Sequence, residues 1–83
     1  MITAFILMRV DYAKMSDIAD HIASLDNVAE VYAVAGDEDL IAVVRGESNE
    51  AIADVVTRQI VKIPGVNSCR TKIALRAYKR PGR

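Results

Sequence analysis

The sequence has very little of what most metal sites and catalytic centres need. It holds one cysteine, one histidine and no tryptophan. A single cysteine excludes an internal disulfide, and zinc sites in proteins take three or four cysteine, histidine or carboxylate ligands. We therefore expect no metal, no cofactor and no catalytic residue. The scarcity of cysteine also fits the reducing environment of the cytoplasm.

Long apolar runs are also missing. No segment reaches the roughly 18 to 20 apolar residues of a membrane-spanning helix, so no membrane partner is expected. The start, MITAFILMRV, is apolar enough to suggest the middle of a signal peptide. Arg9 interrupts it, however, and no cleavage site made of small residues follows, which favours a strand of the mature protein.

What the sequence does have is an excess of apolar residues, 52% of an 83-residue chain. A domain of this size has a thin core, and one layer of helices over one sheet leaves a face of the sheet uncovered. The excess therefore indicates burial against another subunit.

Charges of opposite sign are kept apart along the chain. Residues 1–57 carry all eleven acidic side chains and three basic ones, whereas residues 58–83 carry eight basic side chains and no acidic one. The simplest interpretation is that these charges solvate helix faces and tails; the sharper one is that they steer subunits together or meet a polyanion. Residues 1–78 are expected to form one domain, followed by a flexible basic tail over 79–83.

Hydrophobic periodicity predicts six elements. Residues 2–10 are apolar in both alternating phases, as in a central strand. Spacings of three and four predict a helix over 14–25 and a second helix that begins after the N-cap Ser48. Residues 28–35 and 40–45 are predicted to form a hairpin, and residues 66–78 a last strand with one wet face.

This β-α-β-β-α-β order predicts a ferredoxin-like α+β fold. Two right-handed crossovers give a four-stranded antiparallel sheet in the order 4-1-3-2, with both helices on one face. The first and third strands are apolar in both phases, so the other face should be apolar too. We expect a second copy to cover it, which gives a homodimer of the dimeric α+β barrel type.

Two motifs in this framework resemble a known family. The hairpin VYAVAGDEDLIAVV has a Gly-x-x-Asp tip, and IPGVNSCRTKIAL has Pro-Gly-Val followed by Arg-Thr. Together they are similar to the effector-binding (RAM) domain of leucine- and asparagine-responsive transcription regulators, the Lrp/AsnC family. Full-length members begin with a helix-turn-helix domain. This chain begins at the effector domain and looks like a stand-alone version, so no direct DNA binding is expected.

The resemblance implies a site for a free amino acid where neighbouring dimers meet. Carried over residue by residue, it points to effector-binding residues Gly36, Asp39, Thr71, Ile73 and Ala74. It also implies that homodimers assemble into a higher oligomer, and it makes a full-length Lrp/AsnC-type regulator a candidate partner. Lys72 departs from the family's pattern: in the pocket it would favour an acidic ligand, and otherwise it points into solvent.

The residues of the hairpin tip suit this chemistry by themselves. Gly36 can adopt a positive φ and leave backbone N–H groups free for a carboxylate, while Asp39 can accept from an ammonium group. The alternative is purely structural. Glycine and aspartate form turns, and Asp39 would then only cap the N–H groups of its own turn.

Two functions remain open from the sequence. We favour a non-catalytic module for amino-acid sensing and oligomerisation, linked to transcription regulation. The alternative is a small enzyme of the dimeric α+β barrel type that acts on a hydrophobic substrate. The open face argues against the enzyme, because its strands offer chiefly isoleucine, leucine, valine and alanine rather than polar catalytic groups.

Overall fold

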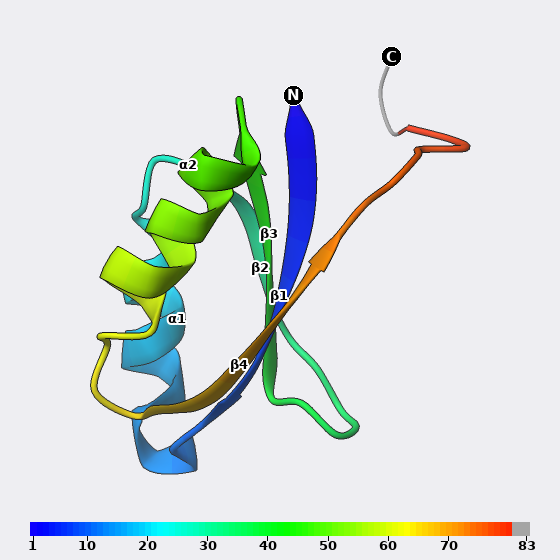
Figure 1. Ribbon diagram of the computed structural model, residues 1–83. Helices are drawn as coiled ribbons and strands as arrows, with labels where there is room; N and C mark the ends of the chain where they lie inside the picture. The colour runs from blue at the N-terminus through cyan, green and yellow to red at the C-terminus, as the bar shows by residue number, and fades with distance from the viewer. Residues whose placement is uncertain (81–83) are drawn as a thin grey trace.

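The computed structural model describes residues 1–80, and its elements follow the predicted order (Figure 1). The strands are β1 (Ile2–Val10), β2 (Val28–Ala33), β3 (Leu40–Gly46) and β4 (Val66–Ile73). The helices are α1 (Met15–Ala23), which follows a 3-10 turn over Tyr12–Lys14, and α2 (Asn49–Asp54), which continues into the π-helical turn η2 (Val55–Ile60). None of the helices within residues 1–80 has the length and apolar character needed to cross a membrane.

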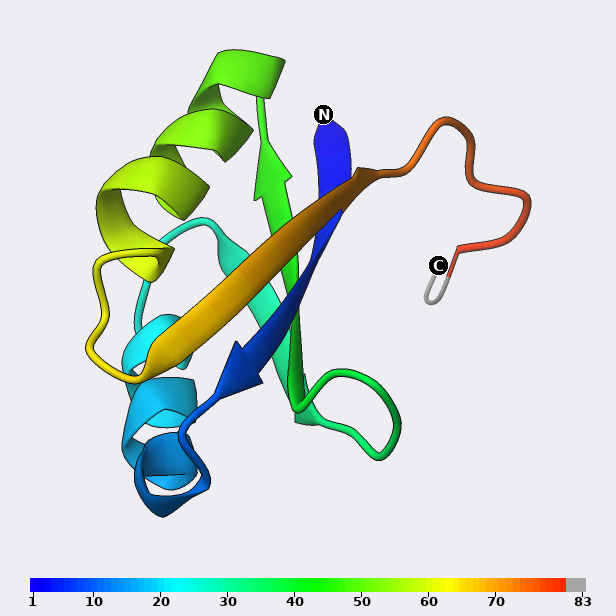
Figure 2. The same ribbon diagram turned by 60° about the horizontal axis from the view of Figure 1, so that its bottom comes forward.

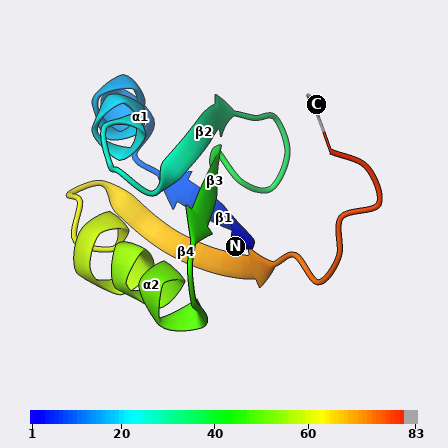
Figure 3. The ribbon, with the colours of Figure 1, turned by 90° about the horizontal axis from the view of Figure 1, so that it is seen from above.

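The four strands form one sheet in the order β2-β3-β1-β4, which confirms the predicted topology. β1 pairs antiparallel with both β3 and β4, and β2 pairs antiparallel with β3. Both helices lie on the same side of this sheet (Figure 3). The sheet therefore has a covered face, which packs against the helices, and an open face on the other side.

Alternation along β1 divides its side chains between the two faces. Ala4, Ile6 and Met8 are completely buried on the covered face, whereas Phe5 on the open face is 39% exposed. The helices complete the core with α1 residues such as Ile22 and with residues of α2 and η2. The core thus lies between the helices and the covered face, and the middle of the open face is still apolar.

The second helix begins as predicted but does not stay α-helical. The Ser48 hydroxyl caps it by accepting from the Ala51 N–H at 3.1 Å. Further along, the Val61 N–H donates to the Val56 carbonyl at 2.9 Å, the i to i+5 spacing of a π-helix. This wider turn brings Val55 and Ile60, five residues apart, into the same core.

The turn before β4 packs tightly against the start of α1. Gly65 has a φ of +99°, and a side-chain carbon there would lie 2.8 Å from Cδ1 of Ile18. The carbonyl of Gly65 accepts from the Asp11 N–H at 2.8 Å. Both the backbone conformation and the close approach therefore require glycine at this position.

β4 ends earlier than the predicted strand 66–78. Its last residue, Ile73, pairs with Ala4, and the Ala74 N–H donates to the Thr3 carbonyl at 2.9 Å. Because β1 begins at Ile2, it offers almost no backbone for β4 to pair with beyond this bond. Residues 74–80 leave the sheet and extend away from the helices (Figure 2). Of the predicted tail, residues 81–83 lie outside the described part of the chain.

Candidate functional site

The loop between β2 and β3 carries Gly36 and the three acidic residues 37–39. Gly36 adopts a φ of +135°, and nothing lies within 4 Å of the place where a side-chain carbon would sit. The Val34 N–H donates to the Asp39 carbonyl at 3.0 Å and closes the loop. The loop over residues 34–39 is thus closed by a backbone hydrogen bond, with open space around its glycine.

Asp39 is bonded to β1 as well as to its own loop. Its N–H donates to the Met8 carbonyl at 2.8 Å, and its Oδ2 accepts from the Val10 N–H at 2.9 Å. The pairing of β1 with β4 shifts register between Arg9 and Val10, so the Val10 N–H is available to a side chain. Asp39 therefore caps a strand end rather than its own turn, and one carboxylate oxygen serves this structural bond.

Glu38 has a partner that the sequence analysis did not identify. Its carboxylate forms an ion pair with the guanidinium of Arg70, which projects from β4 on the open face. The side chain of Glu38 is only 16% exposed, compared with 64% for Arg70. The predicted strand order had already placed β4 beside β1. Only the register of that pairing was missing to bring Glu38 and Arg70 together. The ion pair tethers the loop to the far edge strand.

The three site residues predicted on the last strand, Thr71, Ile73 and Ala74, do not lie on one face. Thr71 and Ile73 project to the covered face, where they line a cleft of about 270 Å³ together with Asn49, Ile52, Ala53, Val56 and Thr57 of the second helix. Ala74 lines a different hollow, in front of the open face. Lys72 also projects to the open face, opposite Phe5, and so points away from the cleft.

Within one chain, the hairpin tip and the end of β4 are far apart. Asp39 is bonded beside Met8 and Val10 at one end of β1, whereas Ile73 pairs with Ala4 near the other end. Five residues along a strand, from Ala4 to Arg9, span about 16 Å. One small ligand therefore cannot contact Asp39 and Ile73 of the same chain.

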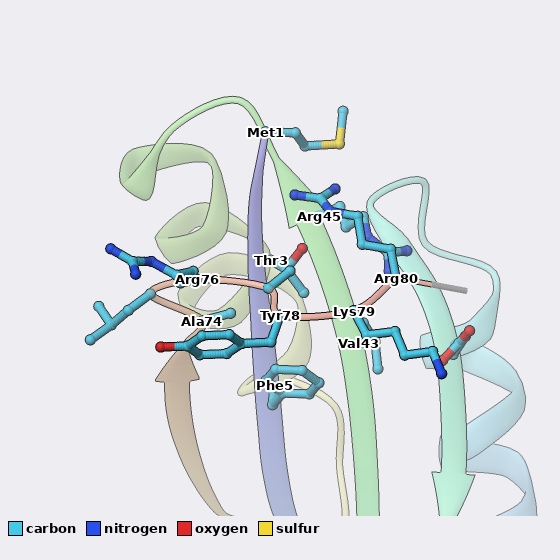
Figure 4. A pocket seen from close by; sticks show the side chains of 13 residues that line it. Met1, Thr3, Phe5, Val43, Arg45, Ala74, Arg76, Tyr78, Lys79 and Arg80 are labelled. Carbon is cyan, nitrogen blue, oxygen red and sulfur yellow. The ribbon is translucent and has the colours of Figure 1, made fainter. Parts of the chain in front are cut away.

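The larger hollow, about 930 Å³, lies between the open face and residues 74–80 (Figure 4). Its basic lining residues are Arg45, Arg76, Lys79 and Arg80, and its one acidic lining residue is Glu30. Phe5 and Val43 form its apolar floor, and Tyr78 hangs over Phe5 in the view of Figure 4. Among residues 1–80 no three acidic, histidine or cysteine side chains are grouped so that they could hold a metal ion.

Within residues 1–80, the side chains of Tyr32 and Cys69 have shifted pKa values, for different reasons. The Tyr32 hydroxyl donates to Oε1 of Glu30 at 3.0 Å, and this bond, together with the charge of the carboxylate, raises the pKa of Tyr32. Burial on the covered face raises the pKa of the Cys69 thiol. Neither group is poised to ionise near neutral pH, so neither has the pKa expected of a general base or nucleophile.

Comparison with known families decides what kind of domain this is. The family model described as the Lrp/AsnC ligand binding domain matches residues 3–83. The chain belongs to the Lrp/AsnC family. This confirms the resemblance seen in the two sequence motifs, and it makes the chain a ligand-binding regulatory domain rather than an enzyme.

Individual similar proteins show how far the similarity extends. The chain is 34% identical over 76 residues to the HTH-type transcriptional regulator FL11 of Pyrococcus horikoshii, and the match covers 92% of this chain and 50% of that regulator. The crystal structure of TTHA0845 from Thermus thermophilus superposes with a TM-score of 0.91 at 45% identity, covering 96% of this chain and 100% of that one. The chain thus spans about half the length of the curated relatives it matches.

A third relative has been solved with a ligand. The feast or famine regulatory protein of M. tuberculosis, complexed with L-methionine, superposes with a TM-score of 0.83 at 25% identity. The similarity covers 100% of this chain and 56% of that protein. Both this structure and TTHA0845 share the fold of the Lrp/AsnC domain described above.

Proposed function

We propose that this domain senses a free α-amino acid and that the amino acid changes how its subunits assemble. The observation that carries the proposal is the match of nearly the whole chain to a ligand-binding domain of transcriptional regulators. The M. tuberculosis relative complexed with L-methionine supports an amino acid as the class of ligand.

In this proposal the hairpin tip binds the two charged groups of the amino acid. The positive φ of Gly36 and the empty space around it allow a ligand carboxylate to approach backbone N–H groups of the loop. Oδ2 of Asp39 accepts from the Val10 N–H, and Oδ1 is left to accept from the ligand's ammonium group.

The remaining predicted contacts come from another subunit. The separation between Asp39 and the end of β4 favours a composite site, with Gly36 and Asp39 from one chain and Thr71, Ile73 and Ala74 from a neighbour. Thr71 would supply a hydroxyl and Ile73 an apolar wall. A site shared in this way makes ligand binding and assembly depend on each other, because neither half is complete alone.

We also propose that two copies pack through their open faces. The middle of that face is formed by Phe5, Leu7, Ile41 and Val43, which are apolar and lie on the two central strands. Leaving this surface in water is unfavourable, and a second sheet at the usual separation of about 10 Å would bury it. Sedimentation should therefore give a dimer or a multiple of a dimer, and Leu7→Glu should dissociate it. A well-folded wild-type monomer at micromolar concentration would contradict this.

A thermal-shift screen of the twenty amino acids tests the ligand proposal. At a ligand concentration of a hundred times Kd, binding adds about 2.7 kcal/mol to stability, and for a domain of this size that raises the midpoint by roughly 10 to 20 °C. Asp39→Asn is the decisive variant, since it keeps an oxygen for the Val10 N–H but removes the charge. Asp37→Asn, at an exposed position of the same loop, is the matched control.

The result expected is a rise with at least one amino acid in the wild type and in Asp37→Asn, and its loss in Asp39→Asn. If no amino acid raises the midpoint, the domain is not an amino-acid sensor. If Asp39→Asn responds as the wild type does, the ammonium group is bound elsewhere.

The relatives named HTH-type transcriptional regulators suggest one further partner. We propose that this domain joins assemblies with a full-length regulator of the same family. Co-expression with a tagged regulator from the same cell tests it, and recovery of only the tagged regulator would contradict it.

A further inference from the structure

The hollow in front of the open face is bounded by the sheet on one side and by residues 74–80 on the other (Figure 4). Its volume of about 930 Å³ lies in the range of pockets that hold small-molecule ligands. Its lining includes none of residues 34–39, so an amino acid bound at the hairpin tip leaves it free. The hollow is therefore a second place where this domain can take a ligand.

The floor of the hollow combines an apolar row with a polar one. The strand pairing places two apolar residues between an acid and a base in one row across the sheet: Glu30, Val43, Phe5 and Lys72. The neighbouring row, two residues along the strands, holds Arg45 and the hydroxyl of Thr3. Two residues of a strand span about 7 Å. A ligand on this floor thus meets apolar surface and, one row away, a guanidinium.

Arg45 is the base that the sheet itself holds in place. Its N–H donates to the Asn27 carbonyl at 2.9 Å, and its carbonyl accepts from Nδ2 of Asn27 at 3.0 Å. Arg45 is half-buried, yet its guanidinium makes no hydrogen bond or ion pair within residues 1–80. A guanidinium on an anchored backbone, with no partner of its own, is suited to a phosphate group, which it binds through two parallel hydrogen bonds.

The segment over residues 74–80 adds further positive charge. Arg76, Lys79 and Arg80 line the hollow, and none of the three is ion-paired within the described part of the chain. Together with Arg45 they face a single acidic lining residue, Glu30. Basic side chains thus outnumber acidic ones by four to one around the hollow, and the resulting field attracts anions.

Two aromatic rings give the hollow a place for a planar group. Phe5 projects into it from the sheet and Tyr78 from the segment in front, and Tyr78 lies over Phe5 in the view of Figure 4. Every nucleobase has a flat face that stacks on such rings. An acidic peptide or an inorganic phosphate chain would use the positive charges but not the rings, whereas a nucleotide uses both.

We propose that the hollow binds a nucleoside polyphosphate. The base stacks between Phe5 and Tyr78, and the phosphates contact Arg45 and the basic side chains of residues 76–80. The ribose spans the gap between the apolar row and the row of Arg45. Over residues 75–80 the structure has no hydrogen bond or ion pair that holds the segment to the sheet, so the segment can close on the ligand without breaking a polar contact.

This site has a consequence for assembly. Phe5 and Val43 also belong to the apolar surface that a second copy covers in the dimer proposed above. The nucleotide and the second copy therefore exclude each other, and saturating nucleotide should raise the apparent Kd of the dimer. Only this consequence rests on the proposed dimer, because the binding site itself lies within one chain.

Calorimetric titration of the full chain tests the ligand class, with ATP, adenosine and tripolyphosphate as probes at low ionic strength and without divalent metal ions. ATP should bind at least about tenfold more tightly than either of the others, since adenosine lacks the phosphates and tripolyphosphate lacks the base. If ATP does not bind, the hollow is not a nucleotide site. If tripolyphosphate binds as tightly as ATP, the rings play no part and the assignment to a nucleoside is wrong.

Two variants separate the contacts to phosphate and base. Arg45→Gln should weaken both ATP and tripolyphosphate by about tenfold or more, whereas Tyr78→Ala should weaken ATP by about fivefold or more and leave tripolyphosphate unchanged. Arg58→Gln, at an exposed arginine of η2 outside the hollow, is the matched control. Circular dichroism checks that each variant is folded, and Arg76→Gln repeats the phosphate test without touching the sheet.

ATP binding that survives in both Arg45→Gln and Arg76→Gln would overturn the phosphate contacts. Sedimentation of the wild type with and without saturating ATP then measures the exclusion of the second copy. A dimer whose Kd is the same in both conditions would contradict the shared floor. None of these results bears on the amino-acid screen, because that screen reads Asp39 and the hairpin tip.

Discussion

The two faces of the sheet are built from the same strands but serve different ends. On the covered face, Ile6 and Met8 are completely buried beneath the helices, and among residues 1–80 no charged residue is buried with them. On the open face, Phe5 and Leu7 of the same strand lie between an acidic edge and a basic edge. The covered face is thus buried by the chain's own helices. The open face has the apolar centre and charged rim that are typical of an interface.

The difference shows which face of the sheet would determine the specificity of the proposed assembly. The covered face needs only apolar residues of suitable volume, and its burial holds the chain together. In the proposed dimer the open face has to discriminate between partners and orientations, and charge is the property that distinguishes orientations. We therefore expect the polar edges of the open face to matter more for the proposed assembly than for folding.

The largest loss of stability should come from truncating a side chain that is buried against the covered face. Ile22→Ala removes a fully buried side chain of α1 and should cost about 2–5 kcal/mol of the free energy of unfolding at any protein concentration. Leu7→Ala on the open face should cost about 1 kcal/mol or less in the dilute chain, and more as the dimer forms. Urea denaturation at two protein concentrations measures both. Equal losses for the two variants in dilute solution would remove the distinction between the faces.

Within residues 1–80, the glycines with positive φ are Gly36 and Gly65, and substitution should cost more stability at Gly65 than at Gly36. Gly65→Ala adds backbone strain and puts a carbon 2.8 Å from Ile18, so we expect a loss of about 2–4 kcal/mol. Gly36→Ala adds strain alone in open space, and about 1 kcal/mol should be lost. Thermal unfolding of the two variants side by side provides the comparison. A larger loss at Gly36 would mean that the loop is packed more tightly than its surroundings indicate.

The thiol of Cys69 offers a smaller, chemical measure of the covered face. Because burial raises its pKa, less thiolate is present at any pH, and alkylation by iodoacetamide at about pH 8 should be at least about fivefold slower than in urea. The raised pKa also favours folding while the thiol is neutral, and that contribution is lost as the pH rises through the folded-state pKa. Alkylation that is equally fast in the folded protein would show that this side of β4 is open.

The smallest effect belongs to Tyr32 on the open face. Its pKa is raised first by the hydrogen bond to Glu30 and by the charge of that carboxylate, so Glu30→Gln should lower it. Ultraviolet absorbance can follow this in a Tyr12→Phe/Tyr78→Phe background, where Tyr32 is the only tyrosine. The bond favours the neutral phenol, so it supports the fold below about pH 10 and is lost as the pH rises through the raised pKa. If the pKa of Tyr32 is unchanged in Glu30→Gln, the Glu30 carboxylate does not raise it.

Most of the fold could be predicted because its signals are local. Alternation in residues 2–10 and the three- and four-residue spacing of 14–25 reflect burial patterns that the covered face imposes. The strand order followed from the handedness of the two crossovers. The end of the last strand could not be obtained this way, because β4 stops where β1 has no more backbone to pair with. The π-helical turn at Val55 likewise depends on packing and not on propensity.

The candidate site was only partly predictable. Gly36 and its positive φ follow from the composition of the turn, but the bond from the Val10 N–H to Asp39 depends on a register shift that no periodicity encodes. Simple alternation would have separated Ala74 from Thr71 and Ile73. The distance between the hairpin tip and the end of β4 needed the pairing of both with β1.

Two neighbouring backbone N–H groups at the end of β1 can report on the hairpin tip. The Val10 N–H points to the side chain of Asp39, and the next N–H, of Asp11, points to the carbonyl of Gly65. A change at the hairpin tip alters the hydrogen bond of the Val10 N–H to Asp39, whereas the Asp11 N–H stays bonded to the Gly65 carbonyl. The ratio of their hydrogen-exchange rates is therefore an internal gauge of the loop, which cancels any change in global stability.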